Sequence, residues 1–593
     1  MKLVVPYIGE IRTVDARMVR LAEFLGIECQ FLPLAKPVPQ TASCLGSEIT
    51  DRATCLVLNP DVMKEWMDGE PPSPEFVLSL LSVFHHVLVY AVRPDPFDSR
   101  LIAALSGGCF QAVREVQDYC APYNIASDSR DICDSFAGLS FGLANRGNDR
   151  TFVSSDTDCA KKLIAIGHDA FLTEMKRENT KIFLLGSESV ADIDAEVGEA
   201  WFTEYFSQFV PHAMVLRHIF GEQCWRPARN YASVVVDDPL LRANYGFLNF
   251  ERLLSLMKQH NFHTTIAFIP HNFRRTSPRI AAALREHAAR LSLCFHGNDH
   301  TAAEFASTDS VLLNTMLQTA EERMRVHSET TGLRCDRVMV FPQGQFSVKA
   351  MAALNARNFD AVVNSVPYPR HQSVRLTLRE LALPAVLRYS GFPLFLRKNS
   401  LKTQDTEIAF KLFFGIPILI VEHHDIFENP QNLIDAVTRI NAVAPGIRWS
   451  SAGEAVSGSI LRRRVSNGPL ELKAYARTIL VENNSASPKR ILIEWDYPDP
   501  PCSLGAVHRN GFPCDGFEVV DSRIRFSAVL DPGISETFSI RHRPSDTLMA
   551  RLGFRYRTGA FVRRRLSEIR DNYVSKSPAL LAATKTLQRR LHR

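Results

Sequence analysis

Two acidic residues follow directly on an apolar segment in the middle of the 593-residue chain. Residues 234–236 are three valines, and Asp237 and Asp238 come next, before Pro239. Two adjacent carboxylates at the end of a buried strand are costly unless a cation or a proton compensates their charge. The pair is therefore a candidate for metal binding or proton transfer, although Asp-Asp before proline is also typical of a turn or a helix cap.

A second apolar segment, residues 291–295, ends in two histidines four positions apart, His296 and His300. Imidazoles at this spacing can face the same side of a loop or of a first helical turn, which suits a divalent metal ion. With a carboxylate from a neighbouring strand they form a two-His, one-Asp set that leaves positions open for water and substrate. An isolated pair of this kind is weak evidence, and the nearby Asp pair strengthens it.

Residues 418–421 form a third apolar segment, which is followed by Glu422, His423, His424 and Asp425. Histidine changes charge near neutral pH and so suits a general acid, which a following aspartate could orient. Because successive side chains of an extended chain point to opposite faces, we expect only one of the two histidines to face the site. A pair of surface histidines is the alternative.

These segments belong to an alternation of strands and helices that begins after Cys224. The predicted strands are residues 233–236, 264–269, 291–295, 338–341, 361–364, 417–421 and 447–449. Short strands separated by helices over about 225 residues predict a closed or partly closed (β/α) barrel over residues 225–455. The polar residues described above all follow the carboxyl ends of these strands.

The regions that flank this barrel differ in pattern. In residues 1–200, apolar runs alternate with helical periodicity and predict an open parallel α/β domain, Rossmann-like or flavodoxin-like. Residues 7–10 hold a single glycine, so nucleotide binding is not supported. Residues 201–224 are predicted as a helical linker, and the alternating strands and turn signals of residues 466–543 predict a small β-sandwich.

Composition sets the class of protein. With 46% hydrophobic and 22% charged residues, the chain is expected to fold into several soluble domains. There is no apolar run of about 18 residues, and the first apolar run is too short for a signal peptide, so we expect a cytoplasmic protein. The twelve cysteines contain no CxxC pair, so neither a disulfide framework nor a cysteine zinc site is predicted.

Positive charge is concentrated at the C-terminal end. Residues 546–593 contain twelve Lys or Arg against three acidic residues, while the whole chain carries only +5. We therefore expect a basic tail rather than nucleic-acid binding. Pro578 separates two predicted helices, and in the first of them one apolar face is expected from Phe561, Val562, Leu566, Ile569 and Tyr573, with Arg563, Arg564, Arg565 and Arg570 around it. This face either packs on the preceding domains or makes a peripheral contact with the inner membrane.

Taken together, the three polar motifs resemble those of the polysaccharide deacetylases, which are carbohydrate esterase family four or the chitooligosaccharide deacetylase homology domain. The resemblance covers about residues 225–455. It implies that Asp237 is the general base and that Asp238 is a metal ligand. His296 and His300 match the family's His-Ser/Thr-x-x-His motif, with Gly297 in place of Ser or Thr, and complete a site for one divalent cation, zinc being the first candidate.

The resemblance also names an acid, for which His424 is the better match because Asp425 follows it, and His423 is the alternative. The family's Arg-x-Pro-Tyr/Phe motif corresponds to residues 340–344, where the arginine is absent and Gln343 replaces the aromatic residue. The backbone N–H of Gln343 could still donate to an oxyanion. The cation that would pair with the catalytic aspartate is sought among Arg388, Arg397 and His271, and no Asp-x-x-Asp-Trp motif is found.

The function that follows is an N-deacetylase. It would release acetate from an N-acetylated amino sugar of a cytoplasmic glycan or of a nucleotide-linked or lipid-linked precursor. Candidate substrate contacts are Tyr245, His271, Asn272, Asn298 and Arg388, with Glu304 of lower weight. The alternative is a non-catalytic glycan-binding or assembly protein on a degenerate barrel. The missing arginine favours this alternative, and the retained Asp-His-His set opposes it.

Overall fold

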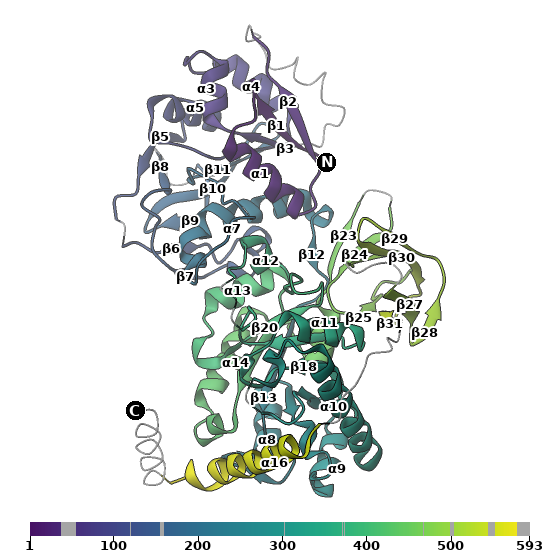
Figure 1. The fold of residues 1–593 in the computed structure, drawn as a ribbon. Helices are drawn as coiled ribbons and strands as arrows, with labels where there is room; N and C mark the ends of the chain where they lie inside the picture. The colour runs from purple at the N-terminus through teal and green to yellow at the C-terminus, as the bar shows by residue number, and fades with distance from the viewer. Residues whose placement is uncertain are drawn as a thin grey trace. The chain divides into compact units, whose positions relative to one another are not determined.

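The computed structural model describes residues 1–36, 55–118, 120–154, 159–301, 303–370, 372, 374–465, 468–497, 503–543 and 552–577. The helix predicted over residues 580–593 lies outside these ranges. By its internal contacts the chain forms two compact units (Figure 1). Unit 1 comprises Met1–Arg226, Arg375–Arg379 and Arg463–Asn467, and unit 2 comprises Pro227–Val374, Glu380–Arg462 and Gly468–Arg593. All three polar motifs lie in unit 2.

Unit 1 is built on a mixed sheet of eleven strands. One half is parallel, in the order β2 (Cys29–Pro33), β1 (Leu3–Tyr7), β3 (Cys55–Leu58), β4 (His86–Val89) and β11 (Thr180–Leu185). The other half is antiparallel and includes β10 (Asp169–Arg177) and β9 (Lys161–Ile166). The predicted open parallel sheet is therefore wrong for this half, because β9, β10 and β11 are joined by two-residue turns that reverse the chain.

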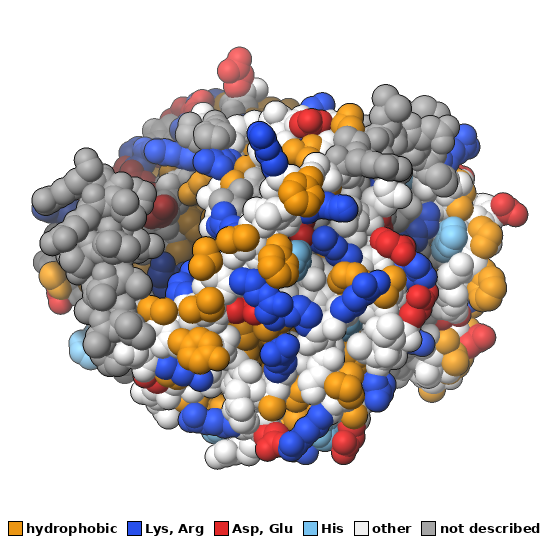
Figure 2. Space-filling view, turned by 60° about the horizontal axis from the view of Figure 1, so that its bottom comes forward, with side chains coloured by type: hydrophobic (Ala, Val, Ile, Leu, Met, Phe, Trp, Pro, Cys, Tyr) orange, Lys and Arg blue, Asp and Glu red, His pale blue; other side chains and the backbone are white. Residues whose placement is uncertain are grey.

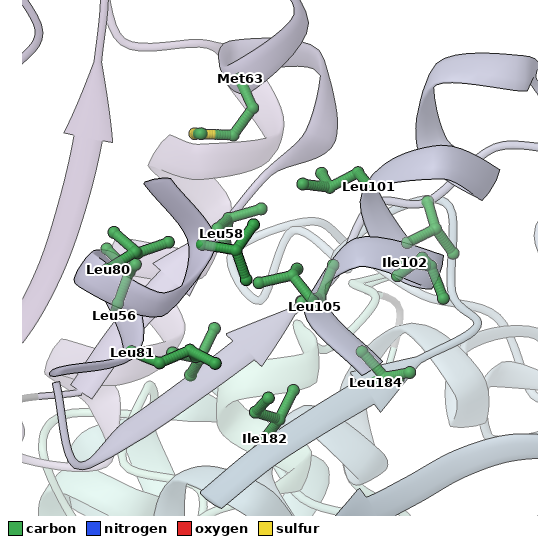
Figure 3. Packing of buried hydrophobic residues seen from close by; sticks show 14 of the residues in the cluster. Leu56, Leu58, Met63, Leu80, Leu81, Leu101, Ile102, Leu105, Ile182 and Leu184 are labelled. Atoms are coloured by element: carbon green, nitrogen blue, oxygen red, sulfur yellow. The ribbon is translucent and has the colours of Figure 1, made fainter. Parts of the chain in front are cut away.

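Apolar side chains between the parallel strands and their helices form the core of unit 1. The helices are α3 (Pro60–Trp66), α4 (Pro74–Val83) and α5 (Pro96–Ser106). Figure 3 shows the side chains that point from these helices and from the sheet toward one another, among them Leu56, Leu58, Leu80, Leu81, Leu101, Leu105, Ile182 and Leu184. A disulfide joins Cys109 and Cys159, which the scattered cysteine spacing did not predict because the two residues meet only through the pairing of the sheet.

Unit 2 contains a closed barrel of seven parallel strands. In order around the ring they are β13 (Tyr231–Asp237), β16 (Thr264–Phe268), β17 (Leu291–His296), β18 (Asp336–Val340), β19 (Ala361–Asn364), β20 (Leu394–Asn399) and β21 (Ile418–Glu422). The barrel closes because β13 pairs with both β16 and β21. Figure 1 shows helices such as α8 (Phe250–His260), α10 (Ser310–Thr331) and α14 (Gln431–Val443) around these strands.

The predicted barrel strands coincide with the ring except at two places. Residues 447–449 were predicted as a barrel strand, but β22 (Arg448–Trp449) pairs only with β13 and lies outside the ring. The strand that takes its place, β20, was missed. Its sequence LFLRKN turns polar halfway, so its apolar run is too short to be distinguished from a loop by pattern alone.

The first barrel helix illustrates how local sequence sets the element boundaries next to the site. The side chain of Asn249 accepts a hydrogen bond of 2.8 Å from the backbone N–H of Arg252 and so caps the N-terminus of α8. Asn261 ends the helix in the left-handed region, with a φ of 52°. The loop between β13 and α8, which holds Tyr245 and Gly246, therefore ends at the Asn249 cap.

Residues 470–542 of unit 2 form strands in two sheets. One contains β24 (Leu470–Ala474), β26 (Lys489–Asp496), β30 (Arg523–Leu530) and β29 (Phe517–Val520), and the other contains β25 (Thr478–Glu482), β31 (Ser535–His542), β27 (Leu504–Arg509) and β28 (Phe512–Cys514). Buried residues from both sheets, including Ile493, Trp495, Val507 and Phe538, belong to one apolar core. Alternate residues of these strands face this core.

The last described element is α16 (Phe554–Ile569), which continues into a π-helical turn over Arg570–Val574. None of the helices in the described part of the chain combines the length and the hydropathy needed to cross a bilayer.

Candidate metal and hydrolase centre

Asp238, His296 and His300 converge at the carboxyl ends of barrel strands. Strands β13 and β17 lie on either side of β16, so the residues that follow them meet at one edge of the ring. The Nε2 atoms of His296 and His300 each lie 3.0 Å from Oδ1 of Asp238. One ligand atom from each residue lies within 4.8 Å of the others. The structure thus brings together the three residues that the sequence predicted as metal ligands.

The backbone around this cluster explains the departure from the His-Ser/Thr-x-x-His pattern. Gly297 has a φ of 62°, and a Cβ built on it would lie 2.2 Å from Oε1 of Glu304 and 2.5 Å from Pro342. A serine or threonine would therefore collide with the carboxylate that holds the loop. That carboxylate accepts hydrogen bonds from the N–H of Asn298 at 2.7 Å and from the hydroxyl of Thr301 at 3.1 Å, which fixes the turn between the two histidines.

The donor set fits a divalent cation. Oδ1 of Asp238 is buried and accepts no hydrogen bond of acceptable geometry from the described residues. Nδ1 of His296 lies 3.1 Å from the carbonyl oxygen of Val340; with its proton there, Nε2 keeps a free lone pair directed at Asp238. Two imidazole nitrogens and one carboxylate oxygen, with the remaining positions open, are typical of catalytic zinc and related centres.

Asp237 is held by Arg397, which comes from the strand that the sequence analysis missed. Nη1 and Nη2 of Arg397 donate to Oδ1 and Oδ2 of Asp237, both at 2.6 Å, and both side chains are buried. Burial alone raises the pKa of the Asp237 carboxyl, but the charge of Arg397, the charge of His296 and the hydrogen bonds from Arg397 together outweigh burial and lower the pKa. Asp237 therefore stays ionised beside the cluster.

The other two candidates for this cation are engaged elsewhere. Arg388 forms a two-pronged ion pair with Glu380, with contacts of 2.7 Å and 2.6 Å. Nδ1 of His271 lies 2.8 Å from Oδ1 of Asp299, which also accepts from Arg323. Of the three groups considered from the sequence, Arg397 is the one that pairs with Asp237.

The two histidines after β21 face different surroundings. In the parallel register of β13 and β21, Val235 pairs with Val421, so the next residues on the same face of the two strands are Asp237 and His423. Nε2 of His423 lies 4.0 Å from Oδ2 of Asp237, and the His423 side chain is 55% exposed. Of the two imidazoles, that of His423 is therefore the one that lies beside Asp237 and is exposed to solvent.

His424 packs away from that position. Its ring stands edge-on to Tyr245 and occupies the space that a Cβ on Gly246 would fill, 2.2 Å from its Nδ1. Nε2 of His424 lies 3.5 Å from Oδ1 of Asp571 in the C-terminal segment. The carboxylate that orients it is therefore Asp571, not the Asp425 that favoured His424 in the sequence.

Further contacts connect residues 554–577 to the loops of the site. The Tyr245 hydroxyl donates to Oδ2 of Asp571 at 2.6 Å, and the N–H of Gly246 donates to Asn572 at 3.0 Å. Burial raises the pKa of Asp571, but hydrogen bonds from His424, Arg570 and Tyr245 lower it to about 2. No local pattern near residue 571 predicts the contact with the barrel loops, because Tyr245, Gly246 and His424 all lie more than 140 positions earlier in the chain.

One ion pair and one hydrogen bond to the backbone extend this arrangement along α16. Arg275, on the loop after β16, pairs with both carboxylate oxygens of Glu568, one of them at 2.8 Å. Arg564 donates to the carbonyl oxygen of Asp238 at 3.1 Å and lies 3.3 Å from the Tyr245 hydroxyl. The backbone of a predicted metal ligand is thus in direct contact with the C-terminal helix.

The remaining residues singled out in the sequence mostly build the loops. Asn298 is fully buried, and its side chain bonds to Asp299 at 2.9 Å and Arg323 at 2.7 Å. Asn272 is also buried and accepts from Arg275 at 3.2 Å. Asn298 is therefore a structural residue rather than an open sugar contact. Gln343 has a left-handed φ of 56°, and within the described chain its N–H donates no backbone hydrogen bond.

No protein-family model matches the sequence, and no curated protein matches it. Among solved structures, the chain is similar to Agd3, described as a novel carbohydrate deacetylase, with 9% identity, a TM-score of 0.48, and coverage of 91% of this chain and 98% of that one. A family 4 carbohydrate esterase from Streptomyces lividans has 12% identity and a TM-score of 0.23, over 37% of this chain and 90% of that one. A peptidoglycan N-acetylglucosamine deacetylase has 15% identity and a TM-score of 0.24, over 38% of this chain and 89% of that one. All three are described as carbohydrate deacetylases or esterases.

Proposed function

We propose that unit 2 is a metal-dependent hydrolase that removes the acetyl group from an N-acetylated amino sugar. One observation supports this above all others: an ionised aspartate held by a buried arginine lies directly beside a two-His, one-Asp cluster. The aspartate is Asp237 and the arginine is Arg397. The cluster is the one that contains Asp238. A structural metal site has no need of a second, fixed carboxylate, whereas hydrolysis needs a base next to the metal.

Each group of the chain has a role in this proposal. Asp238, His296 and His300 would hold one divalent cation, with zinc as the first candidate, and such a cation polarises an amide carbonyl and acidifies water. Asp237 accepts the proton of the attacking water, and Arg397 keeps it ionised and oriented. The N–H of Gln343 donates to the developing oxyanion, a role that needs no particular side chain.

We assign the general acid to His423. It lies on the same face as Asp237, is open to solvent, and could donate a proton to the departing sugar amine. His424 has one nitrogen directed at Asp571 and the other buried against the chain at Gly246. This assignment reverses the order that the family motif implies, and His424 then acts by positioning the loop and the C-terminal segment.

The substrate is proposed to be a glycan, or a nucleotide-linked or lipid-linked glycan precursor, made in the cytoplasm. The loop after β16 carries Phe273 and Arg274, whose guanidinium carbon lies 5.0 Å from the centre of the Phe273 ring. An aromatic face can stack on a sugar ring, and a neighbouring cation suits a phosphate group. These groups favour an anionic carrier over a neutral polysaccharide.

The test combines metal analysis with acetate release. Purified full-length protein should contain about one zinc or similar ion per chain and should release acetate from a panel of free, nucleotide-linked and lipid-linked acetamido sugars. His296→Ala should lose the metal, whereas Asp237→Asn should keep the metal and lose acetate release. Asp425→Asn, which changes an exposed aspartate close to the site, serves as the matched control.

The outcome separates this function from the alternative of a glycan-binding protein. Protein that keeps its metal and binds the acetamido sugars but releases no acetate from any of them would contradict the hydrolase. Metal content unchanged in His296→Ala would contradict the assignment of the ligands.

A further inference from the structure

The helix α16 has its polar side packed against the barrel and its apolar side exposed. The buried positions recur every three or four residues, at Ala560, Arg564, Glu568 and Asp571. The contacts of Arg564, Glu568 and Asp571 with the barrel loops hold this side in place. The opposite side exposes Val562, Leu566, Ile569 and Tyr573, and the exposed Phe554 and Phe561 flank the buried side; the exposed fractions of these six residues are 48% to 84%.

This orientation answers one question that the sequence left open. The apolar residues were expected either to pack on the preceding domains or to meet a membrane. The contacts of α16 with the barrel use polar residues, and Leu566 and Ile569 are 61% and 52% exposed. A row of large apolar side chains on one exposed face marks an interaction surface rather than an ordinary helix exterior.

Positive charge surrounds the apolar side chains. The exposed basic residues of residues 554–577 are Arg555, Arg557, Arg563, Arg565, Arg570 and Lys576. The acidic residues of this segment, Glu568 and Asp571, are both buried and paired with arginines. Its outward surface therefore carries cations and apolar groups without an exposed carboxylate. Figure 2, which turns the α16 end of Figure 1 toward the viewer, shows orange apolar and blue basic side chains intermixed on this face.

The order of these groups around the helix is informative. At about 3.6 residues per turn, Val562, Leu566 and Ile569 form the centre of the exposed face. Arg563 and Arg570 lie along one edge of this stripe, Arg565 lies along the other, and Arg555 lies at its N-terminal end, two turns before Val562. A central apolar stripe with arginines at its edges matches the boundary between acyl chains and headgroups, where the arginines can extend toward phosphates. A nucleic acid would instead require the cations at the centre of the face.

We propose that the exposed face of α16 docks on an anionic membrane surface. The helix lies in the plane of the interface, with Leu566 and Ile569 among the acyl chains and the flanking arginines among the phosphates. Charge complementarity selects the anionic lipid, and the apolar stripe supplies the remaining affinity. This inference goes beyond the proposed function and does not depend on it.

The two faces of α16 then connect the membrane to the site. Arg564 contacts the backbone of Asp238, and Asp571 contacts Tyr245 and His424. A docked helix would hold the loops of the centre beside the headgroup layer. Such a placement suits a substrate that is itself anchored in the membrane.

Co-sedimentation of the full-length protein with vesicles tests the proposal. The protein should bind vesicles of phosphatidylcholine containing phosphatidylglycerol, should not bind pure phosphatidylcholine, and should dissociate at high salt because surface charges are then screened. The double variant Leu566→Asp, Ile569→Asp should lower binding by at least about tenfold, since it places two carboxylates at the interface. Arg563→Ser with Arg565→Ser should weaken binding to the anionic vesicles.

Phe512→Asp provides the matched control, because Phe512 is 74% exposed on β28, away from this helix; its variant should bind as the original protein does. Unchanged metal content and acetate release from a soluble sugar in the double variant would separate loss of docking from loss of folding or catalysis. Equal binding to neutral vesicles, equal binding by the double variant, or no binding by the original protein would overturn the proposal. Binding to a polynucleotide or formation of a dimer in place of vesicle binding, each abolished by the double variant, would assign the face to another occupant.

Discussion

The groups around Asp238, His296 and His300 come from two regions that position side chains in different ways. Asp237 and His296 end strands of a closed ring, in which both neighbours pair with the backbone of each strand. Asp571 and Arg564 belong to a segment that the contacts described above attach to the barrel loops mainly through side chains. A ring fixes a reacting group within narrow limits, whereas ion pairs at a surface can open. We therefore expect the strand residues to govern the chemistry and the C-terminal residues to adjust it.

The largest effect should come from breaking the buried pair beneath the site. Arg397→Met leaves the Asp237 carboxylate buried without its partner, which costs about 3–5 kcal/mol of folding stability or forces the carboxylate to take up a proton. Either result should abolish acetate release. Denaturant unfolding and the acetate assay measure the two effects, and Arg397→Lys should restore only part of the activity because lysine cannot make the two-pronged contact.

Arg388→Met is the matched control for this change. Arg388 was an equal candidate in the sequence but pairs with Glu380 of the short helix α12 (Leu378–Leu381). Its replacement should leave acetate release nearly intact. Similar losses in the two variants would contradict the assignment of Arg397 to the site.

The second effect distinguishes the two histidines that follow β21. His423→Ala removes the proposed general acid and should lower kcat by about a hundredfold or more. His424→Ala removes only a positioning contact and should lower it by less than about tenfold. The metal content of both variants should equal that of the original protein. If His424→Ala has the larger effect on kcat, the acid is His424, with Asp571 as its partner.

The same two regions differ in how far the sequence could predict them. Apolar runs located the ends of β13, β17 and β21, and hence Asp238, His296 and the two histidines, because a hydrophobic run that stops at polar residues marks the end of a buried strand. The choice of Arg397 required β20, whose apolar run is broken by Arg397 and Lys398 themselves. Arg397, which pairs with Asp237, thus also made the strand β20 unrecognisable from its apolar pattern.

The contacts of the C-terminal segment could not be predicted in the same way. Tyr245 and Asp571 are 326 positions apart, and no local signal joins them. The apolar stripe of α16 was visible in the sequence, but by the usual rule it would face the protein. The buried side instead carries Arg564 and Glu568 beside Ala560, and the partners of these polar residues, such as Arg275, are identified only once the barrel loops are placed.

The smallest effect is expected at Asp571. Its pKa in the folded protein is about 2, below the value of about 3.9 for a free aspartate. The ionised Asp571 therefore stabilises the attachment of the C-terminal segment to the barrel loops fully above about pH 4, and this stabilisation is lost as the pH falls toward 2. Asp571→Asn should remove this dependence and loosen the segment at neutral pH. Hydrogen exchange of residues 554–574 should then increase severalfold, with unchanged metal content and a loss of kcat smaller than that of His423→Ala. Asp531→Asn, at an exposed turn of the distant strands, should change neither quantity. Asp571 contacts His424 rather than the reacting groups. If Asp571→Asn lowered kcat as much as Arg397→Met does, the C-terminal segment would take part in the chemistry itself. The division of roles between the barrel strands and the C-terminal segment would then not hold.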